Sequence, residues 1–557
     1  EVFGIGFITA DKIARKLGLP FNSPQRIRAA IYFVLNQAAS EGHVYLPARD
    51  LNQKVLELLL SGETSGRDLF GQELSGQEIF PELLSGQLEE LSRRRLIFLE
   101  RHGDEEKIYS APLYYAEKGS AEKLYSLMKT EPPALPAAEA VLQEILQKER
   151  LSLAPEQVAA VKGACRNGVT VITGGPGTGK TTAIRVLMEL FRRYGLKVLL
   201  GAPTGRAAKR MSEATGREAK TIHRLLEYSY VEGEGFRFQR GEDNPLAAQV
   251  LIIDEASMMD LLLFYSLLKA VPPGCRLVLI GDVDQLPSVG AGNVLRDIIN
   301  SGVVPCVRLN TIFRQARESM IVVNAHRVNR GEFPIINRKQ KDFFFIKEED
   351  PEKVAQTIVE LCRERLPRLA SFDPLEEIQV LSPMRRTKVG VERLNRLLQQ
   401  ELNPPARHKR EIVSGGVTFR LGDKVMQIRN NYEKEVFNGD MGRITHIDPE
   451  EGEIVVSYPE LSSLQEVSYD FTELDDLVLS YAVSVHKSQG SEYPVIVMPV
   501  VTQHYVLLQR NLLYTGITRA KRMAVLVGTP KALAIAVGNN KVETRYSHLS
   551  GRLQELC

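Results

Sequence analysis

A glycine-rich loop between an apolar strand and an apolar-periodic helix constrains the fold of this chain more than any other feature. The loop occupies residues 174–181, reads GGPGTGKT, and fits the pattern G-x-x-x-x-G-K-[ST]. It follows a β-branched run at residues 169–173 and precedes a helix predicted from residue 182 to residue 194. Glycines allow successive backbone N–H groups to point at an anion at the N-terminus of a helix. The pattern therefore predicts a phosphate-binding loop.

The chemistry of this loop assigns roles to its side chains. Lys180 is expected to reach the β- and γ-phosphates of a nucleotide, and the hydroxyl of Thr181 is expected to bind Mg²⁺. The predicted nucleotide-binding residues of the loop are Gly175, Pro176, Gly177, Thr178, Gly179, Lys180, Thr181 and Thr182.

A second apolar strand, at residues 250–253, ends in two carboxylates. Asp254 suits the coordination shell of Mg²⁺, and Glu255 suits activation of the water that attacks the γ-phosphate. A glycine-rich turn alone is often only a turn, but here it occurs together with a strand, a helix and an acidic strand end. The sequence therefore predicts a hydrolase of nucleoside triphosphates that uses Mg²⁺.

Composition narrows the class of protein. A chain of 557 residues, 43% hydrophobic and 25% charged, is expected to form several soluble domains. Its apolar runs are shorter than the ~20 residues of a membrane helix, so no membrane partner is expected. The 71 Lys and Arg residues nearly balance the 69 Asp and Glu residues. A polyanionic partner would therefore need a local groove of positive charge. The five cysteines lack C-x-x-C spacing, which argues against zinc sites and disulfides. It favours a location in the reducing cytoplasm.

The first residues lack an initiator Met and a signal peptide, which predicts an N-terminally truncated fragment. Residues 3–14 are similar to a helix-hairpin-helix turn that contacts DNA phosphates; a plain turn between packed helices is the alternative. A helix at 87–95 followed by strands at 96–100 and 107–110 is similar to a winged helix, although packing between domains explains it equally well. We divide this part into a hairpin-like unit, residues 1–40, and a helical or winged-helix-like region with a linker, residues 41–145.

From residue 146 strands alternate with helices, which predicts parallel α/β sheets. A first α/β domain is expected at 146–302 and a second at 303–405 plus 476–557. Strands expected at 424–428, 442–447, 454–458 and 467–471 interrupt the second domain. They predict a small inserted β-barrel at 406–475.

Further motifs follow one another in a fixed order between residues 146 and 557. They are Gln157, GAPTGRAA at 201–208, TIHRLL at 221–226, the acidic pair at 254–255, GDVDQLP at 281–287, IFRQ at 312–315, VHKSQGSE at 485–492 and YTGITRA at 514–520. This ordered set resembles the motifs of superfamily 1 helicases, and most closely the RecD-like branch. The N-terminal segment resembles the stand-alone bacterial members of that branch, not the RecD subunit of RecBCD.

The resemblance implies a multidomain α/β fold in which two RecA-like P-loop domains face each other across ATP. Gln157 would read the adenine edge, and Gln285 would link the γ-phosphate to the DNA site. Arg314 and Arg519 would reach the γ-phosphate from the second domain, where a planar guanidinium stabilises transferring phosphate by about 10³–10⁵-fold. Gly490 and Glu492 would form the nucleotide-facing end of the motif at 485–492.

The resemblance also implies a DNA track. Its expected residues are Pro203, Thr204, His223 and His486, although a lone histidine is more often a satisfied core or surface residue. Residues 228–240 alternate in period two around a glycine-rich turn, which predicts a β-hairpin at about 227–241. This hairpin occupies the place of the strand-separating pin of the family; an ordinary surface hairpin is the alternative.

Taken together, these features predict a monomeric ATP-dependent DNA helicase. The resemblance implies movement 5′ to 3′ on single-stranded DNA and unwinding at junctions of single- and double-stranded DNA, in DNA repair or recombination. Three alternatives stay open at this point. They are an RNA-directed superfamily 1 helicase, a DNA-binding scaffold switched by ATP, and a helicase with nuclease activity.

Overall fold

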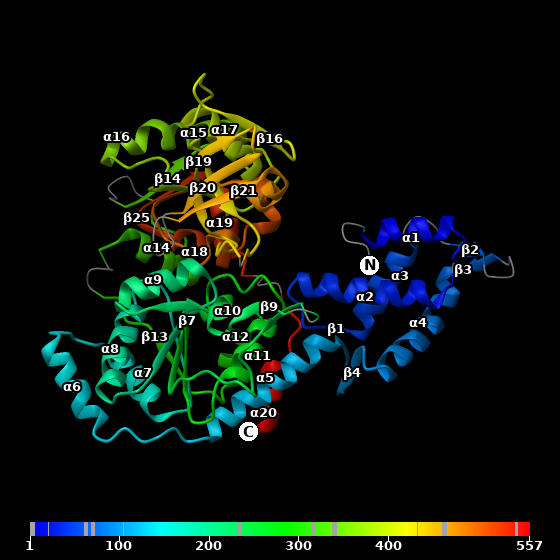
Figure 1. Ribbon diagram of the computed structural model, residues 1–557, viewed down its shortest axis with the longest axis horizontal. Coiled ribbons are helices and arrows are strands. Elements are labelled where there is room, and N and C mark those ends of the chain that lie inside the picture. Colours follow the sequence, from blue (N-terminus) through cyan, green and yellow to red (C-terminus); the bar gives the residue numbers. More distant parts are fainter. Residues whose placement is uncertain are drawn as a thin grey trace.

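The computed structural model has an N-terminal arm beside two stacked α/β domains (Figure 1). It describes residues 6–20, 22–60, 65–67, 73–103, 105–231, 233, 235–313, 318–336, 342–431, 433–458, 465–540 and 544–557. For residues 65–67 and 73–80 it describes the backbone alone. Among the described residues, no helix combines the length and the apolar character needed to span a bilayer.

The N-terminal arm is mainly helical, with a three-stranded sheet and a two-stranded sheet of residues 65–67 and 73–75. Its elements are α1 (Phe7–Lys16), α2 (Pro24–Ser40), β1 (Tyr45–Pro47), α3 (Ala48–Leu60), β2 (Ser65–Arg67), β3 (Glu73–Ser75), α4 (Gly76–Arg93), β4 (Ile97–His102), β5 (Glu105–Ser110) and α5 (Ala111–Lys129). Strands β1, β5 and β4 pair antiparallel in that order, and α2, α3 and α4 pack together over an apolar core. This order of helices and strands is that of a winged helix. The helix expected at 87–95 is the last part of the longer helix α4. Of the hairpin-like segment at 3–14, residues 3–5 lie outside the described residues.

The first α/β domain contains a six-stranded parallel sheet in the order β13-β6-β12-β11-β7-β8. Its strands are β6 (Val169–Gly174), β7 (Val198–Ala202), β8 (Ala219–Thr221), β11 (Val250–Ile253), β12 (Arg276–Gly281) and β13 (Cys306–Leu309). Its helices are α6 (Ala138–Lys148), α7 (Pro155–Arg166), α8 (Lys180–Arg193), α9 (Gly205–Thr215), α10 (Ile222–Leu225), η1 (Ala256–Met258), α11 (Leu261–Ala270) and α12 (Val294–Ser301). The central strands are buried and mainly apolar because helices cover both faces of the sheet. Strand β13 pairs with β6, so this sheet continues beyond the domain boundary expected at residue 302.

The second α/β domain contains a five-stranded parallel sheet in the order β14-β25-β24-β15-β23. Its strands are β14 (Phe343–Lys347), β15 (Ile378–Ser382), β23 (Ala482–Ser484), β24 (Tyr493–Val500) and β25 (Ala520–Gly528). Its helices are α14 (Met320–Asn329), α15 (Pro351–Glu360), η2 (Leu361–Arg365), α16 (Leu366–Ala370), α17 (Val391–Leu402), η4 (His486–Ser488), η5 (Thr502–Leu507), α18 (Arg510–Ile517) and α19 (Pro530–Gly538). The carboxyl ends of both parallel sheets supply the loops that the motifs occupy.

An antiparallel insert interrupts the second domain between α17 and β23. Its elements are β16 (Glu411–Ser414), β17 (Val417–Arg420), β18 (Lys424–Gln427), β19 (Met441–Asp448), β20 (Glu453–Tyr458), β21 (Gln465–Asp470), η3 (Phe471–Asp476) and β22 (Leu477–Leu479). Five of the strands form one sheet in the order β21-β20-β19-β18-β22. Strand β22 pairs with β18, so the insert runs past residue 475, where it was expected to end.

The last helix, α20 (Leu549–Leu556), leaves the second domain. It packs against α5 and α12, as Figure 1 shows for the red helix beside the C-terminus. A buried charge network holds it there. Arg552 donates from Nε to Oε2 of the fully buried Glu117 at 2.9 Å, and it pairs with Glu100 on β4. The segment after α19 was expected within the second α/β domain, but its apolar and charged partners lie in the first domain and in the arm.

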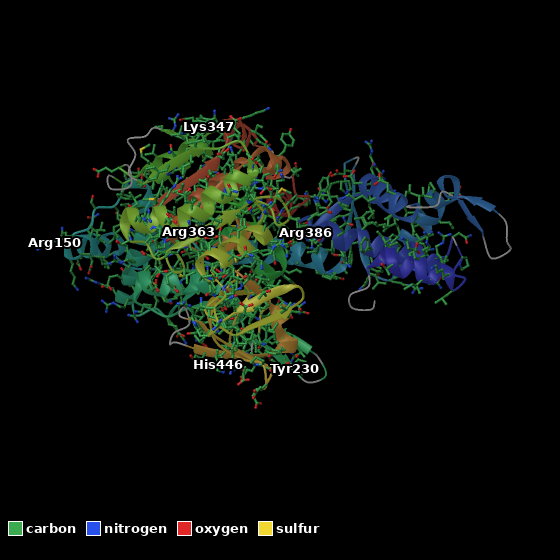
Figure 2. The ribbon with its side chains drawn as sticks, turned by 90° about the horizontal axis from the view of Figure 1, so that it is seen from above. Arg150, Tyr230, Lys347, Arg363, Arg386 and His446 are labelled. Atoms are coloured by element: carbon green, nitrogen blue, oxygen red, sulfur yellow. The ribbon has the colours of Figure 1, made fainter. Side chains whose placement is uncertain are left out.

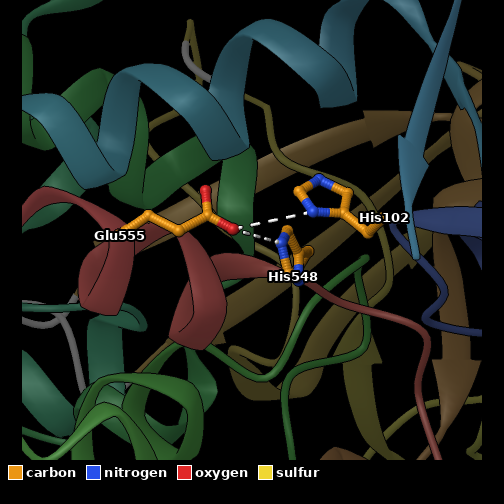
Figure 3. A group of neighbouring side chains, drawn as sticks. All are labelled: His102, His548 and Glu555. Atoms are coloured by element: carbon orange, nitrogen blue, oxygen red, sulfur yellow. Dashed lines mark hydrogen bonds and ion pairs between the residues drawn. The ribbon is translucent and has the colours of Figure 1, made fainter.

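A histidine pair lies beside this network, where strand β4 meets α20. Nδ1 of His102 is 3.6 Å from Oε1 of Glu555, and Nε2 of His548 is 3.3 Å from the same oxygen (Figure 3). The two imidazole rings are 4.2 Å apart between centroids. The C-terminal helix thus contacts the wing of the N-terminal arm through ring, ion-pair and buried-charge contacts.

We expect Arg552→Ala to detach α20 and lower the free energy of unfolding by about 3–5 kcal/mol, because it leaves Glu117 buried without its cation. Thermal unfolding and amide hydrogen exchange in α20 measure this loss. The control is Arg93→Ala, which removes an exposed ion pair on α4 and should leave stability unchanged. Equal stability of the two variants would show that the buried network does not hold the helix.

Candidate active site

The phosphate-binding loop lies between the end of β6 and the start of α8. Nζ of Lys180 donates to the carbonyl oxygens of Gly174 and Gly175, at 2.5 and 3.0 Å, so the ammonium lies inside the loop. Gly177 and Gly179 have φ values of 72° and 79°, in the left-handed region that side chains avoid. The local sequence therefore builds an inward-facing loop at the N-terminus of a helix.

Gln157 lies beside this loop, although 22 residues separate it from Gly179. Its Nε2 donates to the carbonyl oxygen of Gly179 at 3.0 Å, and its Oε1 accepts from the backbone N–H of Ala154 at 2.9 Å. A Cβ atom at position 179 would lie 2.3 Å from Nε2 of Gln157 and 2.8 Å from the ring of Phe313, and the φ of +79° there also favours glycine. The structure thus places the expected adenine-reading glutamine in contact with the nucleotide loop.

The two acidic residues follow β11, at the same edge of the sheet as the loop, and β12 lies between β11 and β6. Desolvation raises the pKa of Asp254 to about 6, and the neighbouring Glu255 carboxylate adds to this rise. The positive charge of Lys180 lowers the pKa of Asp254 and so opposes this rise. Glu255 has a φ of 53°, an uncommon conformation for a residue with a side chain, and strain of this kind concentrates at functional sites.

Gln285 connects the two α/β domains. Its Nε2 donates to Oδ2 of Asp282 at 3.1 Å, and its Oε1 accepts from Nη2 of Arg519 at 3.0 Å. Tyr514 also donates to Oδ2 of Asp282, at 2.7 Å. Arg519 is 3% exposed and donates as well to the backbone oxygen of Ser491. The expected sensor glutamine and one expected phosphate-binding arginine therefore form one buried interdomain network.

The other expected arginine, Arg314, lies outside the described residues. Its neighbour Phe313 donates from its backbone N–H to the carbonyl oxygen of Gly177 at 3.3 Å. Sequence reasoning missed a further contact with the loop. Nε2 of His326, on α14, lies 3.1 Å from the carbonyl oxygen of Pro176. The second domain thus contacts the phosphate-binding loop directly.

Gly490 and Glu492, expected on the nucleotide side, lie opposite α9 of the first domain. Glu492 pairs with Arg210 at 2.8 Å and with Lys521 at 3.3 Å. Thr204 caps the N-terminus of α9 by accepting from Ala207, and a Cβ at position 490 would lie 2.7 Å from Oγ1 of Thr204. Arg210 was not among the expected site residues, although it follows the 201–208 motif by two positions.

The residues expected along the DNA track fall at different places. Pro203 immediately precedes the α9 cap, and His486 is exposed in η4 of the second domain. His223 packs against Tyr228 and Phe238, with ring centroids 5.7 and 5.6 Å away. Burial lowers the pKa of His223. This histidine therefore supports the base of a hairpin.

That hairpin consists of β9 (Tyr228–Val231) and β10 (Gly235–Phe238), which pair antiparallel. Its outer rings, Tyr230 and Phe236, are 65% and 54% exposed and meet edge to face at 5.4 Å. In Figure 2 Tyr230 lies at the outer edge of the molecule. Large exposed apolar rings such as these are suited to contact another molecule. Residues 232 and 234, in the turn, lie outside the described residues.

Two facing α/β domains, a phosphate-binding loop and an interdomain arginine are features of superfamily 1 helicases, and four family models match parts of the chain. The AAA domain matches residues 157–291, and the UvrD-like helicase C-terminal domain matches 479–527. The ATP-dependent RecD-like DNA helicase SH3 domain matches 394–458, and the ATP-dependent RecD2 DNA helicase HHH domain matches 1–45.

Several relatives cover most of the chain, including one from Deinococcus and one from Mycobacterium. The ATP-dependent RecD2 DNA helicase of Deinococcus radiodurans is 35% identical over 560 residues, which cover 100% of this chain and 72% of that protein. The RecBCD enzyme subunit RecD of Mycobacterium tuberculosis is 30% identical over 501 residues, 83% of this chain and 80% of that protein. A solved structure of Pif1 helicase from Bacteroides in complex with ADP-AlF3 and ssDNA aligns with 18% identity and a TM-score of 0.40, over 68% of this chain and 92% of that one.

The chain belongs to the RecD2 family of ATP-dependent DNA helicases. The family inferred from the order of the motifs is therefore confirmed, and so is the predicted fold of two α/β domains with a small inserted barrel and an N-terminal hairpin unit. The predicted function of an ATP-driven DNA helicase is likewise confirmed.

Proposed function

We propose that this protein hydrolyses Mg·ATP between its two α/β domains and thereby moves 5′ to 3′ along single-stranded DNA, in DNA repair or recombination. The observation that carries this proposal is the contact between Arg519 of the second domain and Gln285 of the first. A guanidinium at this position can follow the γ-phosphate and report its presence to the opposite domain. Nucleotide contacts that differ between open and closed states then shift the population of those states.

The residues next to the loop fit a magnesium ion. Thr181 lies in the first turn of α8, and Asp254 lies at the end of β11, where Lys180 lowers its pKa against the effect of desolvation. Hydroxyl and carboxylate oxygens are the ligands that Mg²⁺ favours beside nucleotide phosphates. Thr181 and Asp254 would hold the ion, which would supply charge neutralisation to the phosphates.

The chain's own groups then account for hydrolysis. Lys180 would turn from the loop carbonyls to the phosphate oxygens, and Glu255 would orient the attacking water and accept its proton. Arg314 and Arg519 would stabilise the charge that develops on the transferring group. Gln157 would contact the base. Gly490 and Glu492 would complete the nucleotide side of the cleft from the second domain.

We assign Pro203, Thr204, His223 and His486 to the DNA track. Aromatic stacking on bases contributes about 1–3 kcal/mol per base in proteins that bind single strands. Both halves of the ATP site come from one chain, so a monomer is sufficient for the reaction. Sedimentation at the protein concentration of the ATPase assay tests the monomer; activity confined to a larger assembly would contradict it.

The proposal is tested with one duplex that carries either a 5′ or a 3′ single-stranded DNA tail, in the presence of Mg·ATP. We expect unwinding of the 5′-tailed duplex alone, and loss of that unwinding in Lys180→Ala. Unwinding from the 3′ tail alone would overturn the direction. ATPase activity that DNA stimulates, without unwinding of either substrate, would indicate a translocase that does not separate strands.

The exposed hairpin yields a separate prediction. Replacing Tyr230 and Phe236 together by Ala removes the two rings at its outer end and should reduce duplex unwinding at least 10-fold, a loss of about 1.4 kcal/mol or more in coupling. ATPase activity stimulated by single-stranded DNA should remain, because both rings are exposed on the hairpin and are not part of the nucleotide loop. Parallel loss of both activities would indicate a damaged fold in place of a lost strand-separating pin.

A further inference from the structure

Arg210 joins two acidic residues that come from different domains. It lies on α9 of the first domain, and its Nη2 is 2.8 Å from Oε1 of Glu492 in the second. Its Nη1 donates to the backbone oxygen of Gly490 at 3.2 Å and lies 3.6 Å from Oε1 of Glu255. One guanidinium therefore contacts the carboxylate expected to activate water and the segment expected to face the nucleotide.

A second arginine of α9 contacts the same segment of the second domain as Arg210. Arg206, one helical turn before Arg210, donates to Oγ of Ser491 at 2.8 Å and to the hydroxyl of Tyr493 at 2.9 Å. Residues four apart lie on the same face of a helix, so α9 presents both arginines to residues 490–493. Arg210 retains its charge at this site because its attraction to Glu492 and Glu255 outweighs desolvation and raises its pKa.

The carboxylates on either side of Arg210 are themselves constrained. Glu255 is 8% exposed and occupies a left-handed backbone conformation, so its side chain has few alternative positions. Desolvation alone would raise the pKa of Glu492, but Arg210 and then Lys521 attract its charged form and lower it. A planar guanidinium can bridge two such acceptors at fixed angles, which an ammonium cannot do.

We propose that Arg210 is a positioning residue for ATP hydrolysis, which fixes the carboxylate of Glu255 relative to the second domain through Glu492 and the backbone of Gly490. This inference rests on the proposed role of Glu255 in hydrolysis. Closure of the domains and orientation of the attacking water are then linked by one side chain. Opening the cleft separates Arg210 from Glu492 and releases Glu255 from its second-domain anchor, so hydrolysis is confined to the closed state.

The test compares Arg210→Ala and Arg210→Lys with Lys209→Ala, which changes the neighbouring residue of α9 that pairs only on the helix surface with Glu213. Arg210→Ala should lower kcat for ATP about 10- to 100-fold, because a shift of about 1 Å in a positioned group has an effect of this size. The Kd for ATP, measured with a fluorescent analogue, should not change. Arg210→Lys should recover part of the loss, and Lys209→Ala should behave as the parent.

Double variants separate a positioning role from simple domain packing. Arg210→Ala added to Glu255→Gln should cause no further loss in single-turnover hydrolysis, because both changes remove the same function. Arg210→Ala and Glu492→Gln should likewise combine non-additively. Additive losses in both cycles, or a fall in thermal stability and ATP affinity together with kcat, would overturn the inference in favour of structural packing.

The failure of this inference can be told apart from the failure of the proposed function. Normal kcat in Arg210→Ala, with strong loss in Glu255→Gln, overturns the role of Arg210 and leaves that of Glu255 intact. Normal kcat in Glu255→Gln overturns the proposed function of Glu255, and the positioning role of Arg210 with it.

Discussion

Glu255→Gln is expected to lower kcat for ATP hydrolysis by about 10²–10⁴-fold, the range contributed by a positioned general base. The amide keeps the shape of the carboxylate at the end of β11 but cannot accept a proton from water. Lys180 and Asp254, which hold the phosphates and the metal in our assignment, are unchanged. Binding of ATP should therefore persist while turnover stops.

Steady-state ATPase assays with saturating single-stranded DNA measure kcat, and titration with a fluorescent ATP analogue measures Kd. The matched control is Glu189→Gln on the outer surface of α8, where the carboxylate pairs with Arg192. A variant at position 255 that turns over at the rate of the control would show that another group activates the water. Weakened ATP binding with normal kcat would reassign Glu255 to the ground-state complex.

Arg519→Ala is expected to lower kcat by about 10³–10⁵-fold, the effect of an arginine that stabilises a transferring phosphoryl group. The side chain is 3% exposed and is already directed across the interface by its bond to Gln285. Removing it also leaves the Oε1 atom of Gln285 without this donor. ATP hydrolysis and duplex unwinding should therefore fall together.

Arg522→Ala is the matched control for this variant. Arg522 lies three positions further on, on β25, where it is exposed, lies over the ring of Phe372 and pairs with Glu377. Thermal unfolding of both variants checks that the sheet is intact. If Arg519→Ala retained turnover similar to that of Arg522→Ala, the arginine would serve domain contact and not phosphoryl transfer.

The nucleotide side of the site could be predicted because its information is local. A strand, a glycine loop and a helix occur within 25 residues, and the left-handed φ of Gly179 explains why the pattern needs glycine. The acidic pair follows an apolar strand whose parallel neighbours place it at the same edge of the sheet. Gln157 was located by resemblance alone, since its contact with Gly179 depends on how α7 packs.

The boundaries of the domains could be predicted less accurately than the nucleotide side of the site. Strand β13 joins the first sheet and β22 joins the insert because each pairs with a partner that only the folded chain brings near. The contact between Arg552 and Glu117 spans 435 residues of sequence, so no periodicity of α20 indicates it. The contact between Arg210 and Glu492 could not be predicted for the same reason, because Glu492 approaches Arg210 only when the two domains meet.

The return of α20 to the first domain has a mechanical consequence. The chain crosses between the α/β domains first between β13 and α14, and again between α19 and α20. Two rigid domains joined by one linker can rotate in any direction about that linker. Two separate linkers favour rotation about the axis that passes through both of them. We therefore expect the second crossing to restrict the directions in which the two domains can move apart when the cleft opens.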